Sequence, residues 1–307
     1  MAERGPQGAT LGLLEYISQS NDCADFVNEE DRYRFVDDLT VLEIVNVLTV
    51  GITSYNLKSH IPSDVPHHNG FIDPVKLSSQ AILDKLNDWT INQKMLINEK
   101  KTKTMIFNFT RNHQFTTRLS INDQNIEVID EAKLLGTTFT TDLKWDVNTA
   151  NLVRKANASM QLLRKIAEFA PPISDLKQIY ILFVRSILEQ SSVVWHSSLT
   201  QENKSDLERV QKSAVKIILG DSYRGYKNAL NVLNLQSLDE RREELCLKFA
   251  KKCTRHPKLK GMFPKNIKEH TMSLRTSEKY KVEKTSTERY KNSPVVYMQR
   301  LLNSNES

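Results

Sequence analysis

Two adjacent aspartates, Asp37 and Asp38, are the residues of this chain whose type and spacing best suit metal-dependent chemistry. Short apolar, β-branched runs flank them within residues 33–42, a pattern that predicts a tight β-hairpin with both carboxylates at its turn. Side chains at such a turn can point into one small volume, where their oxygen atoms suit a divalent cation. A magnesium ion held there would neutralise the charge on phosphate oxygens during phosphoryl or nucleotidyl transfer. An isolated Asp-Asp pair is also a common turn sequence, so its neighbours must decide between the two interpretations.

The segment after the aspartates predicts one helix and several short strands. Apolar residues near a 3.6-residue period predict the helix over 75–92. The strands expected from alternating apolar residues cover 94–98, 103–109, 115–121, 126–129 and 134–139. A helix laid on a small antiparallel sheet is an α+β arrangement.

Beyond Trp145 the apolar pattern stays helical. The expected helices cover 147–169, 174–197, 201–219, 226–233 and 238–254. Thr200 and Ser237 stand where helix N-caps are needed. The chain from residue 257 on is lysine-rich and irregular, with a short helix expected over 295–302. The sequence therefore predicts an α+β domain over 1–145, a helical domain over 146–256 and a basic C-terminal tail over 257–307.

The positive charge of the chain is concentrated near its C-terminus. The 307 residues carry a net charge of +6, but residues 241–307 hold 17 Lys and Arg against 7 Asp and Glu. Residues 1–240 hold 26 against 30. A basic segment of this kind suits contact with a phosphate backbone, and a solvated tail is the alternative.

The composition indicates an intracellular protein, cytoplasmic or nuclear rather than secreted. Its three cysteines are too few and too scattered for a disulfide framework. The sequence has no apolar run near the roughly 18 residues of a membrane span, and no signal-peptide pattern. We therefore expect no membrane partner.

Five motifs, in this order, resemble those of the reverse transcriptases of non-LTR (LINE-like) retrotransposons. Residues 5–8 with Leu11 and Gly12 resemble the template-contacting loop, and residues 35–38 resemble the catalytic Asp-Asp hairpin. Trp89 with residues 98–103 resembles a lysine-bearing segment near the nucleotide. Residues 134–136 with 142–145 resemble the primer grip. The fifth motif is the helical half, which contains residues 154–156. The resemblance covers most of residues 5–255 and implies a partial polymerase palm followed by a helical, thumb-like domain.

The resemblance also implies roles for individual residues. Asp37 and Asp38 would bind Mg²⁺ or Mn²⁺ for two-metal nucleotidyl transfer. Lys101 would protonate or neutralise the leaving pyrophosphate of a nucleoside triphosphate. Gln7, Gly8 and Phe35 would contact the template and the nucleotide. Leu135 and Gly136 would form the primer grip. Lys144, Arg154 and Lys155 would contact the nucleic-acid backbone. The implied partners are an RNA template, a DNA primer and the RNA–DNA duplex.

The chain departs from this family in a way that bears on activity. The family carries a further aspartate on an earlier palm strand, after a fingers region that binds the triphosphate. Only four residues precede Gly5, so the chain is expected to be a truncated enzyme without these parts. Two magnesium ions require more carboxylate ligands than Asp37 and Asp38 supply.

Two other interpretations of the sequence stay open. A helical, basic protein that binds nucleic acid without catalysis would share every feature of the C-terminal half. Residues 151–220 are also similar to a helical segment at the N-terminus of AlkB-type tRNA-modifying proteins. None of the seven histidines has an acidic residue two positions later, as the iron site of such an oxygenase requires.

We predict that the purified chain incorporates little or no deoxynucleotide in a primer-extension assay on an RNA template with Mg²⁺. The reason is the shortage of carboxylate ligands for two metal ions. Extension by the wild-type chain that disappears in an Asp37→Ala variant would contradict this prediction and would show that the chain is a complete catalyst.

Overall fold

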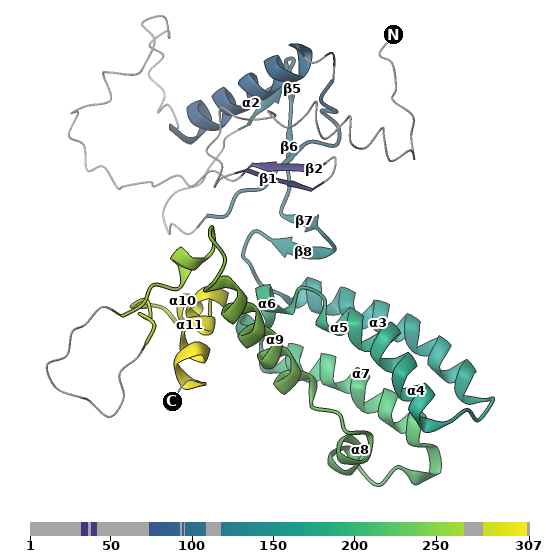
Figure 1. Cartoon of the computed structure of the whole chain (residues 1–307). Coiled ribbons are helices and arrows are strands. Elements are labelled where there is room, and N and C mark those ends of the chain that lie inside the picture. Colours follow the sequence, from purple (N-terminus) through teal and green to yellow (C-terminus); the bar gives the residue numbers. More distant parts are fainter. Residues whose placement is uncertain are drawn as a thin grey trace, which may run out of the picture. The chain divides into compact units, whose positions relative to one another are not determined.

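The computed structural model describes residues 32–35, 38–41, 74–92, 94, 96–108, 118–266 and 279–305, and for 32–35, 38–41 and 74–78 it describes the backbone alone. The chain divides into two units, Met1–Asp130 and Glu131–Ser307 (Figure 1). The described elements mix helices with small two-stranded sheets, in agreement with the α+β class. No helix among these residues is long and apolar enough to cross a membrane.

The Asp-Asp hairpin is confirmed at the level of the backbone. Strand β1 (Arg32–Phe35) pairs antiparallel with β2 (Asp38–Val41), and Phe35 lies opposite Asp38. Two residues, Val36 and Asp37, connect the strands and lie outside the described residues. This pairing is the hairpin that the sequence predicts, with Asp38 as the first residue of its second strand.

The helix α2 (Pro74–Asn92) matches the predicted helix and packs on a short hairpin. This hairpin consists of β4 (Ser120–Ile121) and β5 (Gln124–Asn125). The Gln80 amide fixes the helix to it, because Nε2 donates to the Ser120 carbonyl at 2.8 Å and Oε1 accepts from the Ser120 N–H at 3.0 Å. Leu119, Ile121 and Ile126 form the small apolar cluster beside this contact.

The other strands of this unit differ from the single antiparallel sheet that the sequence predicts. Strand β3 (Lys103–Thr104) pairs with β6 (Glu127–Val128), and the pair is parallel. Residues 96–98 form no strand, and the Lys101 N–H donates to the carbonyl of Asn98 in a turn. Such a turn uses backbone groups that a strand would need for its ladder.

The second unit starts with a β-hairpin and continues as a helical bundle. The hairpin is made of β7 (Glu131–Leu134) and β8 (Thr137–Thr140). The helices that follow are α3 (Asp146–Ala167), α4 (Ile173–Ile179), the π-helical turn η1 (Tyr180–Arg185), α5 (Ser186–Glu189), α6 (Ser192–Trp195), the 3₁₀ turn η2 (His196–Ser198), α7 (Gln201–Leu219), η3 (Gly220–Ser222), α8 (Tyr226–Leu233), α9 (Leu238–Cys253), η4 (Lys260–Met262), α10 (Glu288–Lys291) and α11 (Pro294–Ser304). The unit boundary falls before this hairpin, whereas the sequence predicts a domain boundary at residue 145.

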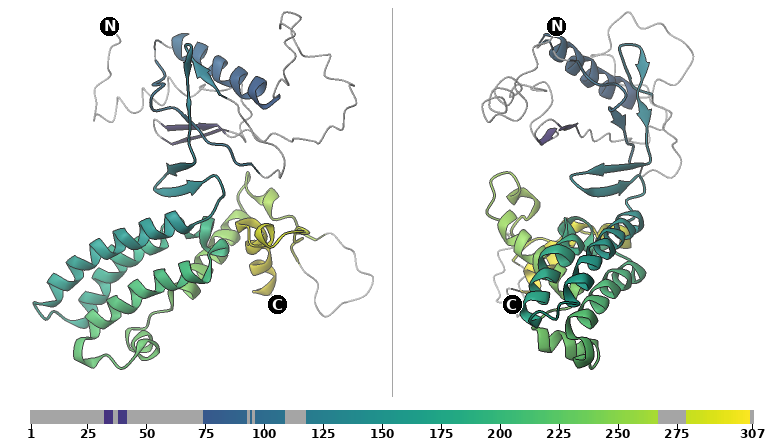
Figure 2. Two further views of the ribbon diagram at one scale, coloured as in Figure 1. Left: turned by 180° about the vertical axis from the view of Figure 1, so that it is seen from behind. Right: turned by 90° about the vertical axis from the view of Figure 1, so that its right-hand side faces the viewer.

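The core of the second unit lies between α3 and α7, which run side by side (Figure 2). Leu152, Ala156, Met160 and Leu163 recur at helical spacing along α3, and each is at most 2% exposed. Three hydrogen bonds satisfy one polar side chain inside this core. Buried Gln211 accepts from the Tyr180 hydroxyl and donates to the Tyr226 hydroxyl and the Gln236 carbonyl.

The predicted helix over 174–197 is interrupted at two places. Its middle turn η1 is π-helical, and the helix ends at Glu189, before Ser191 takes a left-handed backbone with φ of 51°. The Trp195 indole N–H donates to the Gln190 carbonyl at 3.0 Å and so satisfies a group freed by the break. No glycine or proline marks this position, so the sequence carries no signal for it.

Residues 257–307, expected to form a basic tail, contribute an apolar cluster in the part that is described. Phe263, Tyr280, Met298 and Leu302 pack with Cys246, Ala250 and Cys253 of α9. The expected short helix in this segment is α11. Burial of Phe263 and Tyr280 places the neighbouring Lys265 and Lys279 on a folded surface.

We expect a buried histidine to make the stability of the second unit depend on pH. Burial, and then the nearby charge of Arg242, lowers the pKa of His196 from 6.5 to about 4, and its Nδ1 accepts from the Arg242 Nε at 3.3 Å. We predict that the free energy of unfolding falls as the pH drops from 6.5 to about 4, because the unfolded chain gains a proton there that the folded unit excludes. Urea unfolding at a series of pH values measures this fall in the free energy of unfolding.

A His196→Gln variant should show a shallower fall over the same range, and identical pH dependence in both proteins would contradict the prediction.

Candidate nucleic-acid interface

The tip of the β7–β8 hairpin exposes apolar side chains. Leu134 is 39% exposed and Leu135 is 58% exposed. Leu135 and Gly136 form the turn with φ angles of 47° and 86°, the left-handed values that close a two-residue hairpin. This tip is where the sequence predicts a primer grip.

The tip is seated on the end of α5. The Gln190 Nε2 donates to the Leu135 carbonyl at 3.4 Å. A Cβ atom built on Gly136 would lie 2.2 Å from the same Nε2, so the side chain of Gln190 lies directly against this glycine. Gln190 was not predicted from the sequence, which has no motif there.

The hairpin is also fixed to the first turns of α3. Buried Asn148 accepts the Thr138 N–H at 3.1 Å through its Oδ1, and Asn151 donates to the Thr138 hydroxyl at 3.3 Å. Phe139 and Trp145 meet edge to face with ring centroids 5.5 Å apart. These contacts connect strand β8 to the helix, so hairpin and α3 form one body.

A tight turn between the hairpin and α3 carries the first predicted backbone contact, Lys144. Its N–H donates to the Asp142 Oδ1 at 3.1 Å, and its Nζ lies 3.2 Å from the Asp142 Oδ2. The hydrogen bond from the Thr140 hydroxyl, and then that from the Lys144 N–H, lower the pKa of Asp142 to about 2. The carboxylate is therefore ionised and offsets part of the Lys144 charge, while the Lys144 side chain stays 72% exposed.

The other two predicted backbone contacts lie on α3. Arg154 is exposed and donates to the Asn151 side chain at 3.4 Å, and Lys155 is half-buried. Arg154 lies eight positions after the first residue of α3, which corresponds to about 12 Å along a helix axis. Lys144 therefore stands before the first turn of α3, and Arg154 and Lys155 stand about two turns along it.

The predicted catalytic residues lie in the first unit. Phe35 and Asp38 are paired in the β1–β2 hairpin, whereas Gln7, Gly8 and Asp37 lie outside the described residues. Lys101 is exposed in the turn after α2. No group of three or more His, Cys, Asp and Glu side chains that could hold a metal ion is found in the described part of the chain. Magnesium binding at Asp37 and Asp38 therefore stays a prediction.

Comparison with known proteins finds no family model, curated protein or solved structure that matches the chain. The class of the protein is therefore inferred from its own residues and contacts. The features of the second unit that support this inference are the exposed apolar tip of the β7–β8 hairpin, the contacts that fix the hairpin to α3, and the cations on that helix.

A substitution at Gly136 tests the backbone geometry of the hairpin tip. We predict that Gly136→Ala lowers the free energy of unfolding by about 1–2 kcal/mol, because an L-residue is strained at this φ. The flexible Gln190 side chain can move away from the added methyl group, so a second change, Gln190→Ala, should not restore the stability. Denaturant unfolding measures both variants.

Gly261→Ala is the matched control, because nothing lies within 4 Å of a Cβ there. A destabilisation that Gln190→Ala abolishes would show that crowding, and not backbone strain, sets the cost.

Proposed function

We propose that the chain is the palm and thumb part of an RNA-directed DNA polymerase, a reverse transcriptase of the non-LTR retrotransposon type. Its second unit would hold the primer–template duplex. The observation that carries this proposal is the β7–β8 hairpin, whose exposed tip is seated on Gln190 and whose second strand is fixed to α3.

The surface formed by the hairpin and α3 suits contact with a nucleic-acid backbone. Leu134 and Leu135 offer apolar area for sugar rings, and Lys144, Arg154 and Lys155 supply charge for phosphates. The contacts need no hydrogen bond to a base edge, and such binding is independent of sequence. A polymerase requires this property, because it must move along any template.

The proposed chemistry belongs to the first unit. In the complete parent enzyme, Asp37 and Asp38 would share magnesium ions with the further palm aspartate, and the ions would activate the primer hydroxyl and stabilise the leaving pyrophosphate. Exposed Lys101 would add positive charge near that leaving group. These roles rest on the resemblance of the motifs.

The second candidate function is nucleic-acid binding without catalysis. The concentration of Lys and Arg in residues 241–307 favours it independently of the aspartates. The two candidates differ in the role of Asp37 and Asp38, since only a polymerase fragment should bind Mg²⁺ through these carboxylates and lose that binding when both are replaced by alanine.

The duplex-holding surface predicts a specific effect on binding. Replacing Lys144, Arg154 and Lys155 together by alanine should weaken binding of a labelled RNA–DNA hybrid equally for unrelated sequences. The slope of log affinity against log salt should fall by about 1 for each phosphate that the protein no longer neutralises. Fluorescence anisotropy over a range of salt concentrations measures both quantities.

The control for this experiment is Lys227→Ala, because Lys227 is exposed on α8 and carries the same charge. It should leave the affinity and the salt slope close to those of the wild-type chain. A triple variant with wild-type affinity and slope would show that α3 and the hairpin do not hold the duplex.

A further inference from the structure

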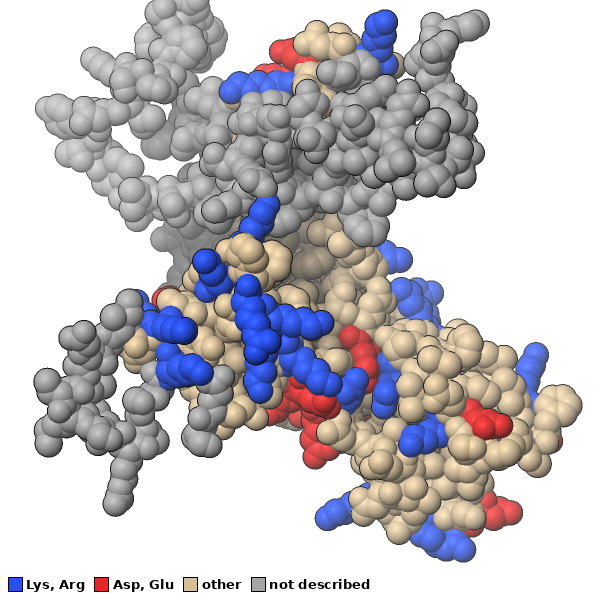
Figure 3. All heavy atoms as spheres, viewed as in Figure 1, with Lys and Arg blue, Asp and Glu red and all other residues tan. Residues whose placement is uncertain are grey.

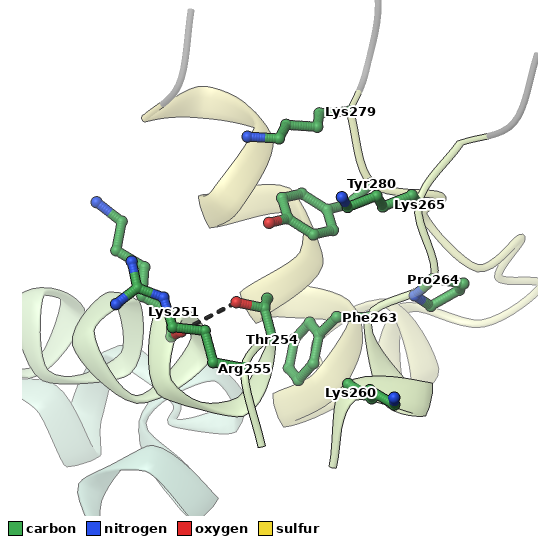
Figure 4. A pocket seen from close by; sticks show the side chains of 9 residues that line it. All are labelled: Lys251, Thr254, Arg255, Lys260, Phe263, Pro264, Lys265, Lys279 and Tyr280. Carbon is green, nitrogen blue, oxygen red and sulfur yellow. Dashed lines mark hydrogen bonds between the residues drawn. The ribbon is translucent and has the colours of Figure 1, made fainter. Parts of the chain in front are cut away.

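A cavity of about 710 Å³ opens at the C-terminal end of α9 (Figure 4). Its lining consists of Lys251, Thr254, Arg255, Lys260, Phe263, Pro264, Lys265, Lys279 and Tyr280. Volumes of this size are typical of cavities that bind small molecules or parts of larger ones. The cavity belongs entirely to the second unit.

The lining of this cavity is strongly basic. Five of its nine residues are Lys or Arg, and none is acidic. These cations come from the last turn of α9, from Arg255 just after it, from η4, and from the segments around Pro264 and Tyr280. Figure 3 shows Lys and Arg side chains gathered over α9 and the segment that follows it. Segments far apart in sequence thus place like charges around one opening.

The dipole of α9 accounts for only part of the positive charge around the cavity. Lys251 lies in the last turn of α9, where the helix dipole favours a cation. Lys260, Lys265 and Lys279 lie outside that helix, so its dipole does not account for them. Lysines also remain exposed here, with no acidic residue in the lining to offset their repulsion.

The floor of the cavity consists of packed side chains. Phe263 and Tyr280 are 4% and 6% exposed and pack in the cluster around Cys253. The segments on either side are joined by hydrogen bonds from the Asn266 N–H to the Lys279 carbonyl and from the Lys281 N–H to the Pro264 carbonyl, both 2.9 Å. Figure 4 shows the two rings facing the end of α9, with Lys279 beyond Tyr280. The basic side chains are therefore attached to a preformed frame.

We propose that this cavity binds a ligand through several phosphate groups at once. Separate lysine charges suit separate phosphates, and Arg255 can donate two parallel hydrogen bonds to one of them. The two rings are buried, which leaves little aromatic surface for stacking a base, so recognition is by charge. The source of the phosphates is either a nucleic-acid strand or a small polyphosphate. This site goes beyond the proposed duplex surface, because it rests on the cavity alone.

The test uses the full chain with two probes. The first is a labelled single-stranded RNA of mixed sequence, followed by fluorescence anisotropy, and the second is inorganic tripolyphosphate, followed by calorimetry. We expect Lys260→Glu and Lys265→Glu each to weaken binding of the true ligand about tenfold or more and, for RNA, to lower the salt slope by about 1 or more. Lys227→Glu is the matched control, and Lys260→Arg should bind as the wild-type chain does.

Each result of this test is decisive. Weaker RNA binding in the cavity variants alone identifies a nucleic-acid strand as the source of the phosphates, and weaker tripolyphosphate binding alone identifies a small polyphosphate. Equal effects of Lys227→Glu and the two cavity variants on both probes would overturn the proposal, as would equal competition by polyglutamate. Thermal unfolding of each variant verifies that the fold is kept. Because the duplex test changes only residues 144, 154 and 155, failure of one proposal is distinguishable from failure of the other.

Discussion

The buried side chain of Trp195 connects the parts of the second unit on which its proposed function depends. Its indole N–H holds the Gln190 carbonyl, and the Gln190 side chain supports the tip of the β7–β8 hairpin. The guanidinium of Arg242 lies 5.8 Å from the ring centroid, which connects α6 to α9. Trp195 is fully buried, so it contributes both a large apolar contact and an indole N–H with a partner. The hairpin and the helix that leads to the basic cavity are therefore positioned around one residue.

Two groups of positive charges in this unit have different surroundings. Arg241 pairs with Glu189 at 3.2 Å and with Glu244 at 3.0 Å, and Lys204 pairs with Asp239 at 3.1 Å. These cations hold helices together, and the Glu189 carboxylate raises the pKa of Arg241 against the opposing effect of burial. The cavity lining has no acidic member. Cations of the first group stabilise the fold, whereas those of the second repel one another and favour an anionic ligand between them.

The sequence predicts the helices better than the strands because its local signals differ in strength. Helices α7 and α8 begin and end where the sequence predicts, and the Thr200 side chain caps α7 as expected. Ser237 forms a capping box with Glu240. The two-residue strands β3 and β6 depend on pairing partners distant in sequence, which local alternation does not specify.

The candidate site could be predicted only in part for the same reason. Gly136 is visible in the sequence because a hairpin turn requires a left-handed backbone, whereas Gln190 becomes its neighbour only through the fold. The basic cavity was visible only as an excess of charge after residue 240. Its apolar floor comes from residues more than 15 positions apart, Phe263 and Tyr280, which no local pattern connects.

The π-helical turn between Tyr180 and Arg185 has a consequence for the phase of the helix that follows it. A π-helical turn accommodates one residue more than an α-helical turn. Each residue of an α-helix rotates the next by about 100°, so the extra residue sets the direction in which α5 presents its last side chains. A lineage with one residue deleted here would regain a regular helix, but Gln190 would turn away from the hairpin. The length of this turn therefore affects the contact between Gln190 and Gly136, although it lies five residues or more from Gln190 in sequence.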